Sequence, residues 1–291
     1  MASRRTRYST LGLALPALAL YSVFFVWPLA SGLYLSLTDW NGLAKTCNFV
    51  GLRNFAELLG DSLFVSSIVV TLKYAAFVTA LQVALGLILA LLLSSERIRF
   101  RPFLTTAFFL PKVMSAAIIS VIWTFLFGNA FRGALGLIGM ENTAFSWLGD
   151  PDRAIYSLGI VEIWHGLGYY MIILMAGITA IPSDVLEAAE IDGAGLWEKT
   201  FHVTLPLLAP TIGVCAILAA ANSLRAFEIP FIMTAGGPGF STTTLAYFIY
   251  NTAFQSKQFG YGCAAALYML AGIMAVTLAQ LRIVQRKGVE Y

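Results

Sequence analysis

Few side chains in this sequence are chemically versatile, and five ionisable ones interrupt otherwise apolar stretches. Lys112 follows Pro111, a pair that predicts a kinked third span with a cation near mid-membrane, and its role stays open. The other four form a group. They are Lys73, Glu162, Arg225 and Glu228. At 1.5 Å per helical residue, all four are expected about 8 to 12 Å below one membrane surface. Charged groups inside a bilayer are costly and usually functional. Two interpretations stay open: a polar lining for a solute path, or ion pairs that hold helices together.

Two uncharged side chains in the same region are also candidates for the solute path. An amide such as Asn222 can donate to and accept from a hydroxyl group. The aromatic ring of Phe227 could stack on a sugar. A hydrogen bond between helices would use the same amide, and packing between helices would use the same ring. The sequence leaves these uses open.

Arrangements typical of enzymes are missing from the sequence. The two histidines, His165 and His202, do not form a metal-binding pair, and the three cysteines are far apart. Lys45 and Lys199 are each followed by a threonine, but Ala44 and Glu198 stand where a phosphate-binding loop has the glycine before its lysine. We therefore expect no catalytic residue, no metal, no cofactor and no disulfide on this chain.

The composition is that of a membrane protein. Of the 291 residues, 59% are hydrophobic and 11% are charged, against about 25% charged in a typical soluble domain. The net charge of +3 is too small to indicate nucleic-acid binding. We expect an all-α integral membrane protein with a single transmembrane domain, 1–291. Six apolar runs have the length of a membrane span: 10–36, 66–93, 103–127, 154–180, 208–233 and 259–281.

Basic residues gather on one side of these spans. The two chain ends, the loop after the second span and the loop 181–207 hold ten lysines and arginines, against five in the opposite loops. Positive residues favour the cytoplasm, so both termini and the loop 181–207 are expected there. The first apolar run is too long for a cleaved signal peptide. Segment 48–58 is expected to form an amphipathic turn and helix at the outer interface.

The loop 181–207 is the one polar island in the second half of the chain. Ser183 predicts a helix N-cap and the alanine-rich residues after it a short helix. Gly193 and Gly195 predict a left-handed end to that helix. A second short helix is expected from about 196 to 203, stopped before Pro206. Such a knob is either a docking surface for another protein or an ordinary helical hairpin.

The island resembles the cytoplasmic EAA loop in the membrane subunits of binding-protein-dependent ABC importers. The spacing matches, and the loop falls between the fourth and fifth of six spans. The residues that carry the resemblance are Glu187, Ala188, Ala189, Asp192, Gly193, Ala194, Phe201, Leu205, Pro206 and Pro210.

A second stretch resembles the sugar permease branch of that family, similar to the maltose and glycerol-phosphate importers. The beginning of the chain, 16–40 and 49–55, is similar as well, so the resemblance covers essentially the whole sequence. One departure is Ala235, where the family often has glycine. The matching residues of the second stretch are Asn222, Phe227, 231–238, Ser241, Thr242, Tyr247, Tyr250, Ala253, Phe254 and Gly260.

The resemblance implies a type I ABC importer fold in the bacterial plasma membrane, with the island as a coupling-helix loop between helices 4 and 5. It implies three kinds of protein partner: a second permease subunit, two ATPase subunits that use ATP and Mg, and an extracytoplasmic binding protein. It also implies a carbohydrate as the transported solute. The coupling residues would be Glu187, Ala188, Ala189, Asp192, Gly193, Ala194, Phe201, Leu205 and Pro206.

Other functions remain alternatives at this stage. An ABC permease of this kind could carry glycerol-phosphate or a polyamine, although the two acidic and two basic side chains at 73, 162, 225 and 228 balance and so favour a neutral solute. A further alternative is an ion-coupled secondary transporter that works without an ATPase.

Overall fold

The computed structural model describes residues 15–95, 98–130 and 147–287. All regular structure in these ranges is helical, apart from one isolated antiparallel bridge between Thr38 and Phe49. The all-α fold class predicted from the composition is confirmed.

Within the described residues, six apolar helical segments are candidate membrane spans. The third along the chain consists of two helices, Arg101–Val113 and Ala116–Gly128, which are long enough to cross a membrane only together and are bent by 97° relative to each other. Five single helices are long and apolar enough to cross a membrane: Leu15–Ser36, Ser62–Ser94, Pro151–Thr179, Leu196–Leu224 and Phe259–Gln285.

The chain divides into two compact units. The smaller comprises Met1–Phe64 with Ile249–Met269, and the larger comprises Val65–Phe248 with Leu270–Tyr291. Helix α4 (Ser62–Ser94), the helix pair α13 (Leu245–Tyr250) and η4 (Asn251–Gln255), and α14 (Phe259–Lys287) contribute residues to both.

In the larger unit, α8 (Pro151–Thr179) is the span most enclosed by other helices. More than half of its apolar window, 56%, is buried, against 28% or less for the other single spans. Close packing explains this: a Cβ added to Gly168 would lie 2.1 Å from the carbonyl oxygen of Phe108 on α5 (Arg101–Val113). Polar side chains of α8 are therefore held inside the helix bundle.

The third span is broken between α5 and α6 (Ala116–Phe125). Pro111 cannot donate a backbone hydrogen bond to the preceding turn, and Met114 and Ser115 are extended. The Ser115 hydroxyl then accepts from the amide of Ala117 at 3.3 Å, which caps α6. The kink expected from Pro111 is a break of 97° between two helices, followed by the π-helical turn η2 (Leu126–Ala130).

The fifth span is longer at one end and shorter at the other than predicted. It runs as one helix through α10 (Leu196–Glu198), η3 (Lys199–Thr204) and α11 (Leu205–Leu224). The expected stop before Pro206 is wrong. Lys199–Thr204 form a π-helical turn in which the amide of Leu205 bonds to the carbonyl of Thr200, so the chain enters the proline at the first turn of α11, where no donor is needed.

The predicted continuation of this span to residue 233 is also wrong. The helix ends at Leu224, and α12 (Glu228–Thr234) is separate. A continuous helix would need an amide from Pro230 for the carbonyl of Ala226, and proline has none. The Thr244 hydroxyl donates to that carbonyl instead, at 2.8 Å. Arg225 and Glu228 therefore lie on either side of a break and not on one helix face.

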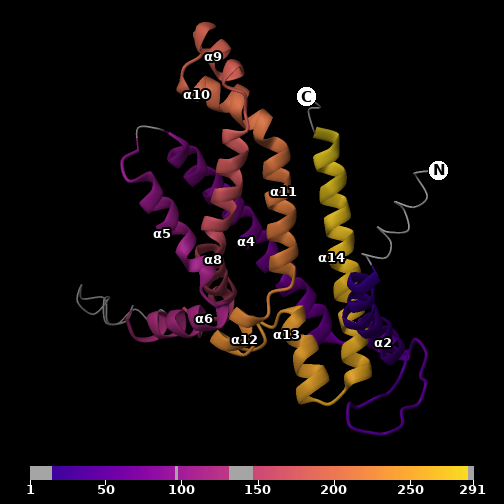
Figure 1. The fold of residues 1–291 in the computed structure, drawn as a ribbon. Helices are drawn as coiled ribbons and strands as arrows, with labels where there is room; N and C mark the ends of the chain where they lie inside the picture. The colour runs from indigo at the N-terminus through magenta and orange to yellow at the C-terminus, as the bar shows by residue number, and fades with distance from the viewer. Residues whose placement is uncertain (1–14, 96–97, 131–146, 288–291) are drawn as a thin grey trace, which may run out of the picture. The chain divides into compact units, whose positions relative to one another are not determined.

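Figure 1 shows α9 (Ser183–Ile191) and α10 extending beyond the ends of α8 and α11, at the opposite end of the larger unit from α6 and α12. The polar loop 181–207 is thus separated from both helix breaks by the length of the spans.

The smaller unit is built from α2 (Trp27–Ser36), preceded by the π-helical turn η1 (Ser22–Val26), and from α3 (Arg53–Gly60) and the beginning of α14. The buried amide of Asn54 donates to the carbonyls of Ser36 and Thr38, at 2.8 and 2.9 Å. α3 is thereby fixed to the end of α2, and segment 48–58 contains the predicted turn and amphipathic helix.

Candidate functional site: a cavity at two helix breaks, and the polar loop

A cavity of about 310 Å³ lies where the two broken spans meet α8. We call it the break cavity. Irregular backbone at membrane depth is tolerated where it lines a polar cavity or is buried in protein, so the two breaks and the cavity belong together. Its lining residues are Lys112, Ala116, Glu162, His165, Asn222, Arg225, Ala226, Phe227, Glu228, Ile229 and Pro230.

Four ionisable side chains of opposite sign face this cavity: Lys112, Glu162, Arg225 and Glu228. Within the described part of the chain, no ion pair forms among them. The Lys112 ammonium lies 6.0 Å from the centre of the Tyr169 ring. The formal charges of these four side chains sum to zero. The cavity can therefore offer hydrogen-bond donors and acceptors without a net charge that would attract an anionic or a cationic solute.

Asn222 and Arg225 are arranged by hydrogen bonds to each other. A guanidinium nitrogen of Arg225 donates to Asn222 Oδ1 at 3.1 Å, and its Nε donates to the carbonyl of Ala221 at 3.0 Å. Asn222 Nδ2 in turn donates to the Tyr170 hydroxyl at 3.4 Å. Both side chains remain exposed, so each has capacity for a solute hydroxyl.

His165 connects the cavity to the break in the third span. Its Nε2 lies 3.3 Å from the carbonyl oxygen of Met114, the residue at the break. The imidazole is buried and its Nδ1 has no hydrogen-bond partner among the described residues. The histidine thus satisfies a carbonyl that the interrupted helix leaves without an amide.

The polar loop is an ordered, solvent-facing hairpin. α9 ends at a turn in which Gly193 has φ +85°, and the Ala194 amide bonds to the carbonyl of Ala189 at 2.9 Å. Gly195 is extended instead of left-handed, and its amide donates to Glu198 Oε2 at 2.9 Å. The left-handed turn is therefore confirmed at the first glycine, while the second begins the next helix.

The two arms of the hairpin are joined by the ion pair of Lys199 with Glu190. The hydrogen bond from this lysine lowers the pKa of the Glu190 carboxyl. All three acidic side chains, Glu187, Glu190 and Asp192, are exposed, and Glu190 is the one that this ion pair holds. The predicted N-cap at Ser183 is wrong, because α9 begins at that residue and Pro182 precedes it as the cap.

The chain matches the family model described as "Binding-protein-dependent transport system inner membrane component" over residues 82–289. This range includes both helix breaks and the whole polar loop. The chain belongs to this family of transport permeases.

Curated relatives of this permease cover nearly its full length. It is 34% identical over 280 residues to the probable starch degradation products transport system permease protein AmyD of Thermoanaerobacterium thermosulfurigenes, covering 94% of this chain and 93% of the relative. It is 32% identical over 282 residues to the sn-glycerol-3-phosphate transport system permease protein UgpA of Agrobacterium fabrum, covering 94% of each.

A solved structure shares the fold of the permease. A bacterial ABC transporter involved in the import of the acidic polysaccharide alginate contains a chain that superimposes with a TM-score of 0.84 at 20% identity, with 98% of each chain covered. The type I importer fold predicted for the permease is confirmed.

The break cavity of this permease brings together most of the residues predicted for the solute path. Glu162, Asn222, Arg225, Phe227 and Glu228 line it. The side chain of Lys73 is exposed on α4 and does not line it.

Sequence reasoning did not assign Lys112 or His165 to this site. Both lie close to the break in the third span, and the Pro111-Lys112 pair was the available signal. In the polar loop it also missed Trp197, which is 77% exposed and stacks on Phe201 with ring centres 5.9 Å apart.

Proposed function

We propose that this permease forms the translocation path for a neutral carbohydrate, such as an oligosaccharide or disaccharide, in a bacterial ABC importer of the plasma membrane. The break cavity carries the proposal. Its charges balance without pairing, and the amide of Asn222 beside the ring of Phe227 suits a solute made of hydroxyls and apolar ring faces.

The relatives support a solute of this class. AmyD is named for starch degradation products at 34% identity, and UgpA for glycerol-3-phosphate at 32%. The two sequence identities are too similar to decide between a sugar and a phosphate ester as the solute. A phosphate would favour a net positive lining, whereas the break cavity opposes Lys112 and Arg225 with two carboxylates. The cavity therefore favours the neutral solute.

Energy would enter through the polar loop. No ATP site is expected on this chain, so two partner ATPase subunits would bind and hydrolyse ATP with Mg. The proposed contacts are Glu187, Ala188, Ala189, Asp192, Gly193, Ala194, Phe201, Leu205 and Pro206. Support comes from the exposure of the hairpin and from its internal ties, which suit a rigid docking element.

The remaining parts of the assembly follow from the same proposal. A second, homologous permease would complete the path, an extracytoplasmic binding protein would deliver the carbohydrate, and both termini of this chain would be cytoplasmic with the polar loop.

Affinity purification of the tagged chain from its own host membranes tests the assembly. We expect an ATPase and a second permease to co-purify. The purified assembly in liposomes, with its binding protein added, should accumulate labelled maltotriose only when ATP is inside with the ATPases. Accumulation of glycerol-3-phosphate or spermidine in place of neutral sugars would overturn the carbohydrate assignment. ATP-independent uptake by this chain alone would instead indicate a secondary transporter.

A further inference from the structure

A second cavity, of about 540 Å³, lies entirely within the smaller unit. We call it the Trp40 cavity. Its volume is that of a small-molecule site. It is lined by Asp39, Trp40, Asn41, Val50, Arg53, Asn54, Glu57, Asp61, Lys257, Gln258 and Tyr261.

We propose that the Trp40 cavity is a separate carbohydrate-binding site on the face of the membrane opposite the polar loop. With the bent pair α5 and α6 counted as one span, the chain has six candidate spans, and this count puts residues 37–61 and 256–258 on that face. The inference rests on the proposed function, because it assumes a carbohydrate solute, but it concerns a site apart from the break cavity. A sugar bound there would be held at the surface before it entered the path.

The indole of Trp40 is set as a fixed platform in this cavity. Its Nε1 donates to the carbonyl of Ala44 at 2.9 Å, and the ring of Phe259 packs against it with centres 5.4 Å apart. The carbonyl of Trp40 accepts the amide of Gly260 at 3.0 Å. An aromatic surface that is already ordered binds a sugar ring with little loss of side-chain entropy.

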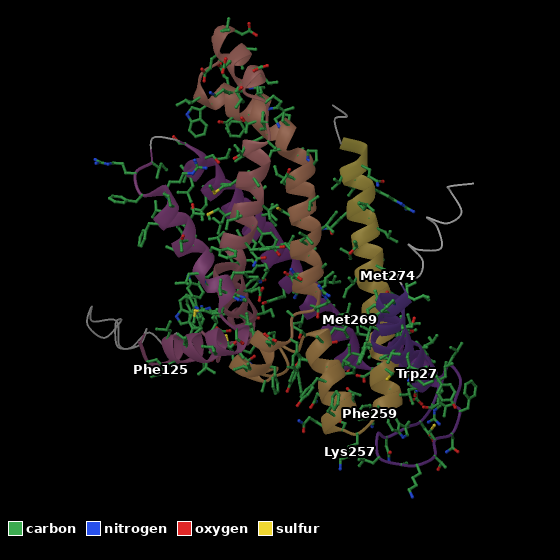
Figure 2. All side chains as sticks on the ribbon, in the orientation of Figure 1. Trp27, Phe125, Lys257, Phe259, Met269 and Met274 are labelled. Carbon is green, nitrogen blue, oxygen red and sulfur yellow. The ribbon has the colours of Figure 1, made fainter. Side chains whose placement is uncertain are left out.

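The approach of α14 to this loop depends on a glycine. A Cβ on Gly260 would lie 2.0 Å from the carbonyl oxygen of Thr38. Figure 2 shows Lys257 beside Phe259, the first residue of α14. Lys257, in the turn before the helix, lines the cavity, and the ring of Phe259 supports the indole of Trp40.

The acidic side chains are oriented by neighbours in the same unit. Asp39 accepts the amide of Asn48 at 2.7 Å and its side-chain Nδ2 at 2.9 Å. These bonds lower the pKa of Asp39. Glu57 accepts from Arg53 Nε at 2.7 Å. A carboxylate has about four acceptor positions, so both retain positions for sugar hydroxyl donors.

The free donors point to the same ligand class. Lys257 and Gln258 are exposed, and neither side chain makes a hydrogen bond or ion pair within the described residues. Three carboxylates and two cationic side chains line the cavity. A peptide whose charges are all of one sign would therefore be repelled by some of these groups. A neutral carbohydrate both donates and accepts, and its ring face suits the indole.

Saturation-transfer NMR of the full chain in nanodiscs with maltotriose tests the site. We expect Trp40→Ala to weaken binding about tenfold and Gln258→Ala about threefold, as loss of a platform and of one hydrogen bond would. Trp27→Ala is the matched control, since Trp27 is 72% exposed on α2 and lies outside the cavity. It should leave maltotriose binding unchanged.

Trp40→Phe guards against a folding defect, because it keeps an aromatic ring and should retain part of the binding. Gln258 is exposed, so its replacement tests the cavity without disturbing packing. Binding that persists in Trp40→Ala and Gln258→Ala and disappears in Asn222→Ala would place maltotriose only in the break cavity and overturn the inference. So would an absence of maltotriose binding to the unaltered chain.

Uptake by the assembled importer separates the two proposals. If the unaltered assembly accumulates no carbohydrate, the proposed function fails. If it accumulates maltotriose normally and the Trp40 and Gln258 variants bind the free sugar normally, only the second site fails. Lower uptake with unchanged sugar binding would assign the surface to contact with the binding protein and overturn the carbohydrate site.

Discussion

At the level of single residues, Gly193 is a position in the polar loop where the backbone conformation favours glycine. Its φ of +85° is left-handed, and a Cβ there would meet no atom within 4 Å. Any penalty for alanine therefore comes from the backbone, about 1 to 2 kcal/mol, and not from a clash.

Replacing Gly193 by alanine should reduce ATP-driven uptake severalfold while the chain still inserts and co-purifies less ATPase. Gly195→Ala is the matched control, because Gly195 has φ −69° and ψ 171°, which alanine adopts freely. ATPase recovery and sugar uptake are the measurements. Equal behaviour of the two variants would argue against a role for the left-handed turn.

Asn222 is the residue through which the break cavity can be tested for solute contact. Asn222→Ala should raise KM for the carbohydrate about tenfold, because a polar contact with the solute is lost while the cavity stays open. Lys73→Gln should leave KM unchanged, since Lys73 does not line the cavity. Initial rates of uptake over a range of sugar concentrations measure both. A KM unaffected by Asn222→Ala would favour a purely structural hydrogen bond to Tyr170.

Glu190 provides a pH-dependent test of the polar loop. Its pKa is lowered from 4.5, first through the hydrogen bond from Lys199. Because the folded value is the lower one, the ion pair favours the ordered hairpin above about pH 4.5, and this contribution is lost as the pH falls through the lowered pKa. In the Lys199→Met variant, the midpoint pH of the Glu190 titration should rise to the ordinary pKa of a glutamate.

Carboxyl chemical shifts of ¹³C-labelled glutamate in the full chain give that midpoint. Lys257→Met removes a lysine outside the loop and should not move it. An identical Glu190 midpoint in Lys199→Met and the unaltered chain would show that the ion pair does not form in solution.

Among the helices, α5 and α8 depend on close contact at Gly168. A methyl group there would lie 2.1 Å from a backbone oxygen of α5, which cannot rotate away. Gly168→Ala should lower the thermal unfolding midpoint in detergent by several degrees and reduce uptake. Gly272→Ala on α14, with nothing within 4 Å of its added Cβ, should leave the midpoint equal or slightly higher. Equal midpoints in the two variants would contradict the close packing.

The positions of the helices followed from apolar length and the kink in the third span from Pro111, but the end of the fifth span at Leu224 was not predicted. Pro230 stands in the apolar run 208–233 as a signal of a helix end, but nothing near it in the sequence shows that the carbonyl of Ala226 bonds to Thr244. Pro206, a strong stop signal, is accommodated by a π-helical turn. The prolines mark where a helix can end, but whether each one does end it depends on hydrogen bonds that only the folded chain supplies.

In the candidate site too, some residues could be predicted from the sequence and others could not. Glu162, Asn222, Arg225 and Glu228 were visible as polar residues in apolar sequence. Lys112 was visible as well, but its place beside α8 results from the bend in the third span. His165 offered little signal, since its contact is with a backbone carbonyl.

For the whole molecule, the number of crossings fixes which segments share a membrane face. Asp192→Cys and Lys257→Cys, each made in a chain with Cys47, Cys215 and Cys263 replaced by serine, should be labelled from opposite sides. A membrane-impermeant maleimide applied to intact cells should react at position 257 and reach position 192 only after permeabilisation. Labelling of both positions in intact cells would contradict six crossings.

The unbroken helix Leu196–Leu224 gives the importer a fixed dimension. Its 29 residues make it roughly 43 Å long at 1.5 Å per residue. Had Pro206 ended the helix, as its sequence suggests, a flexible joint would separate Trp197 from Asn222. Without that joint, a shift of the loop end along the helix axis moves the residues beside the break cavity by the same distance. Under the proposed coupling role, an axial motion imposed on the loop would therefore reach the cavity undiminished.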